Sequence, residues 1–145
     1  MKLNRPAFYL LSCTWGAVTT AVGILIFFVL FLTGHKPKRW GYSYYFEVGK
    51  KPWGGASWGF VFLKDRSRGN SRLKNHEFGH ALQNCAFGPF MLILVSLPST
   101  LRYWARSIAA SSGHPPRKSY DSIWFEGQAT RLGTEKMRRL KGLDD

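Results

Sequence analysis

The pentapeptide His76-Glu77-Phe78-Gly79-His80 is the stretch that most strongly indicates the structure of the middle of this chain. It is a complete His-Glu-x-x-His pattern. On an α-helix, residues four positions apart lie one above the other, so both imidazoles can reach the same metal ion. Glu77 lies between them, where its carboxylate can take a proton from a water molecule held by that metal. The pattern therefore predicts a helix that carries a metal site and a general base.

The motif belongs to a longer predicted helix, with polar sequence before it and a breaker after it. The basic segment over residues 64–74 is typical of a loop, and the helix is expected to begin near Ser71 or Arg72. It can run through Cys85 and must end by Gly88-Pro89, since proline does not continue a helix.

Two short stretches before this helix have the residue pattern of β-strands. Residues 42–48 are rich in aromatic and β-favouring types, and residues 57–63 place alternate aromatic side chains on one face. The segment between them contains glycines and a proline, as a loop would. The sequence predicts a mainly α-helical fold with a small β-hairpin. The hairpin would either cover the helices or offer an edge strand for pairing with an extended peptide.

A long apolar segment lies near the N-terminus. Residues 7–32 form a run of 26 without a charge, and as a helix it would measure about 39 Å, enough to cross a bilayer with some tilt. A cleaved signal peptide would have a shorter apolar region that ends in small residues, whereas Phe31-Leu32-Thr33-Gly34-His35 follows here. We therefore expect residues 1–35 to form an N-terminal tail and an uncleaved transmembrane helix.

A second apolar segment follows the motif helix, and no residue from Ala81 to Leu101 is charged. Its most apolar part, residues 90–97, is bracketed by Pro89 and Pro98 and is short for a second crossing. It better fits a buried or re-entrant helix. Residues 36–145 are then expected to form one membrane-associated domain.

The chain has 21 Lys and Arg against 8 Asp and Glu, a net charge of +13. Beside a membrane segment, the nearest anionic partner is the lipid headgroup. Nucleic acid is disfavoured, because no DNA- or RNA-binding signature accompanies the charge. More cations follow the first apolar segment than precede it, which places the body on the cytoplasmic side of a bacterial inner membrane. Basic residues also end the last predicted helix and are expected to contact lipid or an acidic partner: Lys136, Arg138, Arg139 and Lys141.

Two histidines do not complete a zinc site, which needs a third protein ligand and leaves a fourth position for water. A third histidine six residues after His80 is excluded, because residue 86 is alanine. The last helix is expected over about residues 121–140, and a charge within its apolar segment at residues 124–129 needs a reason. We therefore favour Glu126. The alternatives are His114 in a proline-rich loop, Asp121, which also fits a helix N-cap, and Glu135, which fits a solvated ion pair.

These residues resemble the membrane-bound gluzincin metallopeptidases, the class that contains the CAAX prenyl protease and the HtpX-like heat-shock proteases. In that class, a His-Glu-x-Gly-His helix supplies two zinc ligands and the general base, and a later Glu-x-x-Ala-Asp helix supplies the third ligand. The resemblance implies a compact, helical, zincin-like body in which His76, His80 and Glu126 bind Zn²⁺ and Glu77 is the base. It covers about ten positions, and Thr130 stands where the class places the aspartate.

Three more residues are candidates for supporting the site or binding substrate. Gln83 lies on the same predicted helix face as the two histidines. Thr130 follows Glu126 by one turn and can hydrogen-bond a histidine in place of the aspartate. Asn75 precedes the motif and would either begin the helix or bind the backbone of a substrate.

The leading hypothesis from the sequence is a membrane-anchored zinc metallopeptidase that acts on a peptide or protein. The alternative is a non-catalytic membrane adaptor with a structural or vestigial metal site and a basic helix that binds lipid or protein. Glu77 favours the peptidase, because a structural zinc site has no use for a carboxylate at that position.

Overall fold

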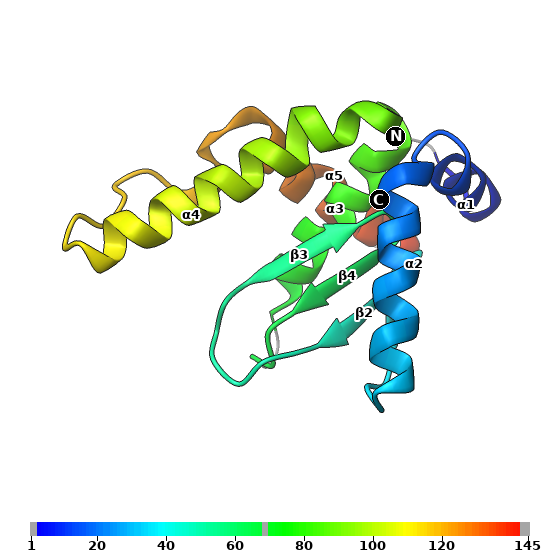
Figure 1. Cartoon of the computed structure of the whole chain (residues 1–145). Helices are drawn as coiled ribbons and strands as arrows, with labels where there is room; N and C mark the ends of the chain where they lie inside the picture. The colour runs from blue at the N-terminus through cyan, green and yellow to red at the C-terminus, as the bar shows by residue number, and fades with distance from the viewer. Residues whose placement is uncertain (1–2, 68–69, 143–145) are drawn as a thin grey trace.

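The computed structural model describes residues 3–67 and 70–142 and shows a mainly helical chain with one small mixed sheet (Figure 1). Within these residues the α-helices are α1 (Arg5–Cys13), α2 (Ala17–Leu32), α3 (Ser71–Phe87), α4 (Leu97–Ser111) and α5 (Trp124–Leu140). The strands are β1 (Lys38–Trp40), β2 (Ser43–Glu47), β3 (Gly55–Trp58) and β4 (Val61–Lys64). Short helical segments at Gly88–Phe90, Leu92–Ser96 and Tyr120–Ser122 complete the chain; the second is a π-helix and the others are 3-10 turns.

Helix α3 matches the helix predicted around the motif. Asn70 caps its N-terminus, because the side-chain oxygen accepts a hydrogen bond from the Leu73 amide at 3.0 Å. The helix ends at Phe87, and Gly88 then takes a positive φ of 54°. A side chain at residue 88 would also collide with the ring of Trp15, so this breaker requires glycine.

The sheet differs from the predicted hairpin. Its strand order is β1-β2-β4-β3, and β2 runs parallel to β4, with Tyr44 opposite Val61. The predicted pairing of residues 42–48 with residues 57–63 as one hairpin is therefore wrong. The second stretch contains two strands, because Gly59 takes a φ of +58° and turns the chain back between β3 and β4. Strand β1, antiparallel to β2, is an addition to the predicted elements.

A buried carboxylate holds the loop that leads into β3. Asp65 accepts hydrogen bonds from the backbone amides of Trp53 at 3.1 Å, Gly54 at 2.9 Å and Ser67 at 2.9 Å. Burial alone would raise the pKa of Asp65, but its hydrogen bonds outweigh burial and lower the pKa to about 2. The carboxylate therefore stays charged and fixes the place where β3 begins.

The N-terminal apolar segment is divided into two helices that meet at 98°. Because α1 ends at Cys13 and α2 begins at Ala17, the predicted continuous helix over residues 7–32 is not observed. The break is held by α3. The side-chain amide of Asn84 donates to the Gly16 carbonyl at 3.3 Å, and a Cβ at residue 16 would lie 2.2 Å from the amide nitrogen. The bend is thus enforced by a contact between segments far apart in the sequence.

The length and hydropathy of each helix bear on whether it can cross a bilayer. Across residues 3–67 and 70–142, no single helix is both long and apolar enough to cross a bilayer. Two bent pairs reach that length and composition only when taken together: α1 with α2, and residues 71–90 with residues 92–111, which meet at 117°. The transmembrane helix therefore stays a prediction.

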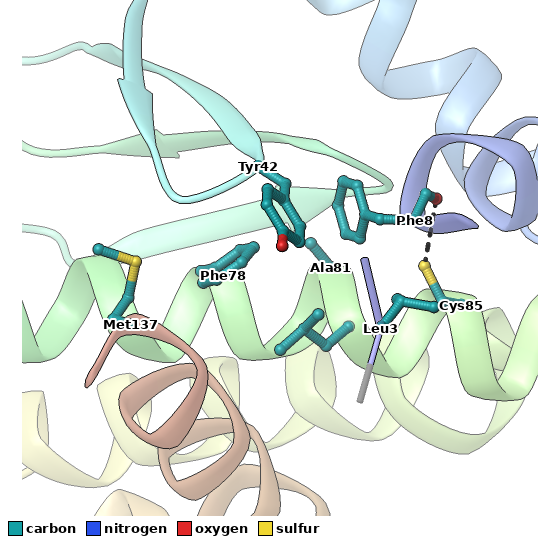
Figure 2. Close-up of a cluster of buried hydrophobic side chains, with 8 residues drawn as sticks. Leu3, Phe8, Tyr42, Phe78, Ala81, Cys85 and Met137 are labelled. Atoms are coloured by element: carbon teal, nitrogen blue, oxygen red, sulfur yellow. Dashed lines mark hydrogen bonds between the residues drawn. The ribbon is translucent and has the colours of Figure 1, made fainter. Parts of the chain in front are cut away.

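The main apolar core lies where α1, α3 and α5 meet the turn between β1 and β2 (Figure 2). Phe8 and Phe78 are completely buried and pack with Tyr42, with ring centroids between 5.4 and 6.2 Å apart. The thiol of Cys85 also donates to the Phe8 carbonyl at 3.6 Å. Helix α1 is therefore part of the core rather than a free extension of α2.

Helices cover both faces of the sheet. In Figure 1, α2 lies in front of the strands and α3 lies behind them with α5; α2 and α3 both contact β3 and β4. Helix α4 extends away from this body and has no buried residue. The apolar segment predicted to be a buried or re-entrant helix, residues 90–97, buries Met91 and Val95 against Phe125 and exposes much of the rest.

Helices α3 and α5 pack almost backbone to backbone. A Cβ at Gly79 would lie 1.8 Å from the Ala129 carbonyl oxygen, and one at Gly133 would lie 1.7 Å from the Asn75 carbonyl oxygen. Nothing larger than glycine fits at either position. This contact brings the first turn of α5, which carries Glu126, against the motif on α3.

Replacing Gly133 by alanine should destabilise the protein, although alanine favours an isolated helix by about 1 kcal/mol. The added methyl group has to push the two backbones apart, and overpacking of this kind costs about 1–3 kcal/mol or more. Thermal unfolding followed by circular dichroism would compare Gly133→Ala with Arg131→Ala, an exposed position on the same helix. A melting temperature of Gly133→Ala equal to or above that of Arg131→Ala would contradict the close packing.

Candidate metal centre

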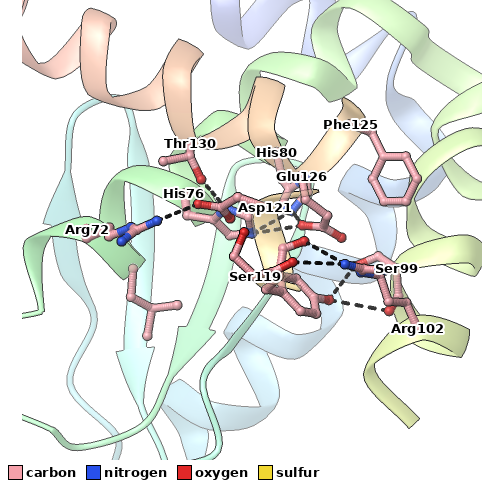
Figure 3. A network of polar contacts seen from close by, with 12 residues as sticks. Arg72, His76, His80, Ser99, Arg102, Ser119, Asp121, Phe125, Glu126 and Thr130 are labelled. Atoms are coloured by element: carbon pink, nitrogen blue, oxygen red, sulfur yellow. Dashed lines mark hydrogen bonds and ion pairs between the residues drawn. The ribbon is translucent and has the colours of Figure 1, made fainter. Parts of the chain in front are cut away.

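The two motif histidines and Glu126 meet in the interior between α3 and α5 (Figure 3). His76 Nε2 and His80 Nε2 lie 3.1 Å apart, and Oε2 of Glu126 lies 3.0 Å from the first and 3.2 Å from the second. One ligand atom of each residue lies within 4.8 Å of the other two, and all three residues are buried. This group could hold a metal ion.

The spacing of these atoms suits a small tetrahedral metal. Nitrogen and oxygen ligands bonded to zinc at ~2.0–2.1 Å are about 3.4 Å apart along the edges of a tetrahedron. The three observed separations, 3.0 to 3.2 Å, are close to that value. Two imidazole nitrogens and one carboxylate also form a three-ligand set that leaves one coordination position open.

Glu126 is fully buried, and neither of its oxygens accepts a conventional hydrogen bond from any described residue. Burial alone would raise the pKa of its carboxyl group, but the facing imidazoles of His76 and His80 hold that pKa well below its usual range. The side chain is therefore charged in a place where charge is costly unless a cation is beside it.

Hydrogen bonds orient both imidazoles toward Glu126. The Nδ1 atom of His76 lies 2.8 Å from Thr130 Oγ1, and Nδ1 of His80 lies 2.8 Å from Gln83 Oε1. Gln83 is itself fixed, because its amide donates to the Phe125 carbonyl at 2.8 Å. Since the Gln83 oxygen can only accept, Nδ1 of His80 carries the proton and Nε2 is free to bind a metal. Gln83 and Thr130 thus each contact a motif histidine, which is one of the roles that the sequence leaves open for them.

Glu77 lies on the turn of α3 between the two histidines and is 4% exposed. Burial raises the pKa of its carboxyl group, with the two neighbouring imidazoles acting in the opposite direction. Strand β3 begins beside it: a Cβ at Gly55 would lie 2.5 Å from Glu77 Oε1. The glycine thus allows the edge strand to pass close to this carboxylate.

The alternatives for a third ligand lie elsewhere. Asp121 is paired with Arg72 at 2.7 Å, and its other oxygen is 3.9 Å from His76 Nδ1, the ring nitrogen that faces Thr130. It lies in the 3-10 turn before α5, so the predicted N-cap role is wrong. His114 is exposed in the loop after α4, and Glu135 is exposed on α5.

Asn75 serves a packing role. Helix α3 begins at Ser71, so Asn75 does not start it, contrary to one of the two predictions. Its side chain accepts a hydrogen bond from Trp40 Nε1 at 3.0 Å and lies 3.4 Å from Thr134 Oγ1. These bonds connect β1 and α5 to the motif helix. Both ends of the Asn75 amide therefore have partners inside the protein.

A polar group from α4 and the turn before α5 also borders the site, and sequence reasoning did not identify it (Figure 3). The Tyr120 hydroxyl lies 3.0 Å from Ser99 Oγ, and its ring centroid is 6.2 Å from that of His76. Arg102 fixes this turn by donating to the carbonyls of residues 119 and 120. Burial, helped by two nearby carboxylates, raises the pKa of Tyr120 to about 12, so its hydroxyl stays a donor. No spacing rule links a tyrosine to a ligand six residues later, so only the fold reveals it.

Comparisons with known proteins do not assign this site. No protein-family model matches the sequence, and no curated protein or solved structure matches the chain. Function is therefore inferred from the chemistry of the site.

The purified protein should contain about one zinc ion per chain, held by the three buried ligands. Glu126→Ala should remove most of the bound metal, whereas Asp121→Ala and His114→Ala should retain it, since neither side chain belongs to the buried group. Plasma mass spectrometry of protein purified without chelator would measure the metal content. Full retention of metal in the double variant His76→Ala, His80→Ala, or loss of metal in His114→Ala alone, would overturn the assignment.

Zinc affinity should rise with pH through the titration of His80. Burial by itself would lower the pKa of His80, but the Glu126 and Glu77 carboxylates and the hydrogen bond with Gln83 together outweigh burial and raise the pKa above the ordinary 6.5. Because zinc binds neutral imidazole, the proton held by the metal-free site must leave. Below the raised pKa, affinity should therefore increase about tenfold per pH unit for each proton released, and above it the increase should level off. Competition with a chromophoric chelator, corrected for the chelator's own protonation, would measure this; a profile that is flat from about pH 5 to 7 contradicts it.

Proposed function

We propose that this protein is a zinc-dependent peptidase in which Glu77 is the general base. The observation that carries the proposal is the position of Glu77, a buried carboxylate on the helical turn between two histidines that point at one carboxylate ligand. A structural zinc site is closed by four protein ligands. Here three candidate ligands are accompanied by an acid–base group, which is the composition of a catalytic site.

The residues would divide the work as follows. His76, His80 and Glu126 would hold zinc, which when bound lowers the pKa of a water molecule and polarises a peptide carbonyl. Glu77 would accept a proton from the attacking water and return it to the leaving amine. Its raised pKa supports this role, because a carboxyl group that titrates closer to neutral pH both takes and gives a proton more readily.

Tyr120 is the second side chain with a role to play toward substrate. Its hydroxyl keeps its proton, and the turn that carries it is held in place by Ser99 and Arg102. A fixed donor beside a metal site is suited to stabilise negative charge as it develops on a carbonyl oxygen. We therefore place Tyr120 in the site as a hydrogen-bond donor.

Strand β3 supports a peptide as the substrate. It lies at the edge of the sheet, paired with β4 alone, and it begins beside Glu77. Extended peptides bind to such free edges through main-chain hydrogen bonds. A peptide added to this edge would pass the proposed base with its backbone, where hydrolysis takes place.

The adaptor hypothesis explains the same metal group in another way. It assigns function to the basic end of α5, where Arg138 and Lys141 are exposed. It gives no role to Glu77 beyond occupying space. The two hypotheses therefore differ in what they require of residue 77.

Glu77→Gln should abolish peptide hydrolysis and leave the rest of the protein intact. Glutamine keeps the size and polarity of the side chain but cannot accept the proton, and loss of a general base costs ~10² to 10⁴-fold in rate. Hydrolysis of a peptide library by detergent-solubilised protein would be compared with metal content and thermal unfolding of the same samples. Gln83→Ala serves as the comparison variant. It removes the hydrogen bond to His80 and should therefore lower metal affinity, while the proposed base Glu77 stays unchanged.

Equal hydrolysis by wild type and Glu77→Gln would refute the peptidase proposal. If no preparation hydrolysed any peptide, and Arg138→Ala with Lys141→Ala removed a cellular function that Glu77→Gln retained, the adaptor would take its place.

A further inference from the structure

Helix α2 turns a broad apolar face away from the protein. On its inner side Thr19, Thr20 and Gly23 are buried, and further along the helix Phe27 packs against Tyr44 and Phe46. The side it turns outward is apolar, and each of these residues is more than 40% exposed: Val18, Val22, Leu25, Phe28, Val29, Phe31 and Leu32. In water, an amphipathic helix buries its apolar stripe, whereas α2 exposes these apolar side chains to solvent.

The inner contacts prevent α2 from rotating to hide that stripe. The side chain of Asn84 on α3 hydrogen-bonds Thr19 and Thr20 and donates to the Gly16 carbonyl. Gly23 packs so tightly that a Cβ there would lie 2.2 Å from the Trp58 carbonyl oxygen. The outward apolar face is thus a fixed property of the fold.

A cationic hollow of about 470 Å³ lies at the C-terminal end of the same helix. Its volume is in the range of small-ligand sites, ~300–1,000 Å³. The residues that line it are Thr33, Gly34, His35, Lys36, Lys38, Glu47 and Arg66. Thr33 and Gly34 directly follow Leu32, the most exposed residue of the apolar face, so the hollow and the apolar face adjoin.

The positive charge of this hollow exceeds what the protein itself requires. Glu47, its one carboxylate, is already paired with Lys38 at 2.8 Å and with Lys64 at 3.4 Å. Among the residues that the structure describes, neither Lys36 nor Arg66 forms an ion pair. The end of α2 contributes a partial negative charge of only about −0.5. A net positive charge is left facing solvent.

We propose that α2 and this hollow together bind an anionic phospholipid. The phosphate would lie among Lys36, Lys38 and Arg66, because Lys and Arg are the side chains that recognise phosphate. The acyl chains would lie along the outward face of α2, beside Phe28 and Leu32, and remove it from water. A free phosphate would satisfy the cations but leave the apolar face exposed, which favours a lipid as the occupant. The proposal is independent of the peptidase chemistry.

The test measures binding of a short-chain phosphatidylglycerol to the full chain in detergent, by native mass spectrometry. The triple variant Lys36→Ala, Lys38→Ala, Arg66→Ala should lose on the order of 100-fold in affinity, since each cation near an anionic lipid contributes about one kcal/mol. The matched control is Arg138→Ala, Arg139→Ala, Lys141→Ala, which removes the same formal charge from the end of α5. None of these residues lines the hollow, so affinity for a single lipid molecule there should change by less than about threefold, although the same variant is expected to weaken contact of the α5 end with an extended lipid surface.

Two further arms separate lipid from other anions. Phe28→Ser with Leu32→Ser keeps every cation and should also weaken binding of phosphatidylglycerol, whereas phosphatidylcholine and inorganic phosphate should bind weakly to wild type. Retained zinc content and circular dichroism would show that each variant is folded. If the two triple variants lost equal affinity for phosphatidylglycerol, the effect would be one of net charge alone, and the proposed lipid site would be refuted. Binding of phosphate or a soluble oligoglutamate as tight as that of the lipid would overturn it as well.

Discussion

The near contact of the α3 and α5 backbones is the constraint on which the candidate metal centre depends. Gly79 and Gly133 lack side chains because the carbonyl groups of Ala129 and Asn75 occupy that space. A glutamate side chain spans only a few bonds, so the carboxylate of Glu126 meets the two imidazoles only when the helices are this close. The apolar core and the sheet then serve to keep α3 in place, but the ligand geometry is set at two glycines.

The site concentrates charge in a buried interior, and its composition suits a divalent cation. Two buried carboxylates accompany the two imidazoles: Glu77 lies between them on α3, and Glu126 faces them from α5 at 3.0 and 3.2 Å. A divalent ion would balance two carboxylates, whereas without it Glu126 can be compensated only by protonated histidine. The opposite pKa shifts of the two carboxyl groups follow from their contacts. Glu126 faces both imidazoles directly, while burial dominates at Glu77. The same fold thus gives Glu126 the charge that the proposed ligand needs and Glu77 the raised pKa that the proposed base needs.

Local sequence pattern predicts the two helices that carry the site. The sheet pairing and the break before α2 depend on contacts between distant residues, which the sequence does not display. The bounds of α3 and the shared face of its two histidines follow from helical spacing and breaker residues, which the sequence displays. Glu126 is favoured because a charge within an apolar segment needs a reason, and Thr130 because it follows Glu126 by one turn. Their contact with the histidines depends on how α5 packs against α3. The sheet was mispredicted because Gly59 turns the chain within what looks like one strand, and because parallel pairing of β2 with β4 leaves no local signal. The break between α1 and α2 also leaves no local signal in the sequence. Its cause, Asn84, lies 68 residues from Gly16.

Asn84 has a mechanical consequence as well as a structural one. It lies one helical turn after His80 on α3, and its amide group holds the first turn of α2. A change in the tilt of α2 must therefore either break these hydrogen bonds or rotate α3, and with α3 the imidazole that faces Glu126. If α2 lies in lipid, the thickness and lateral tension of the bilayer act on its tilt and, through the Asn84 hydrogen bonds, on α3. The geometry at the metal position would then respond to the physical state of the membrane.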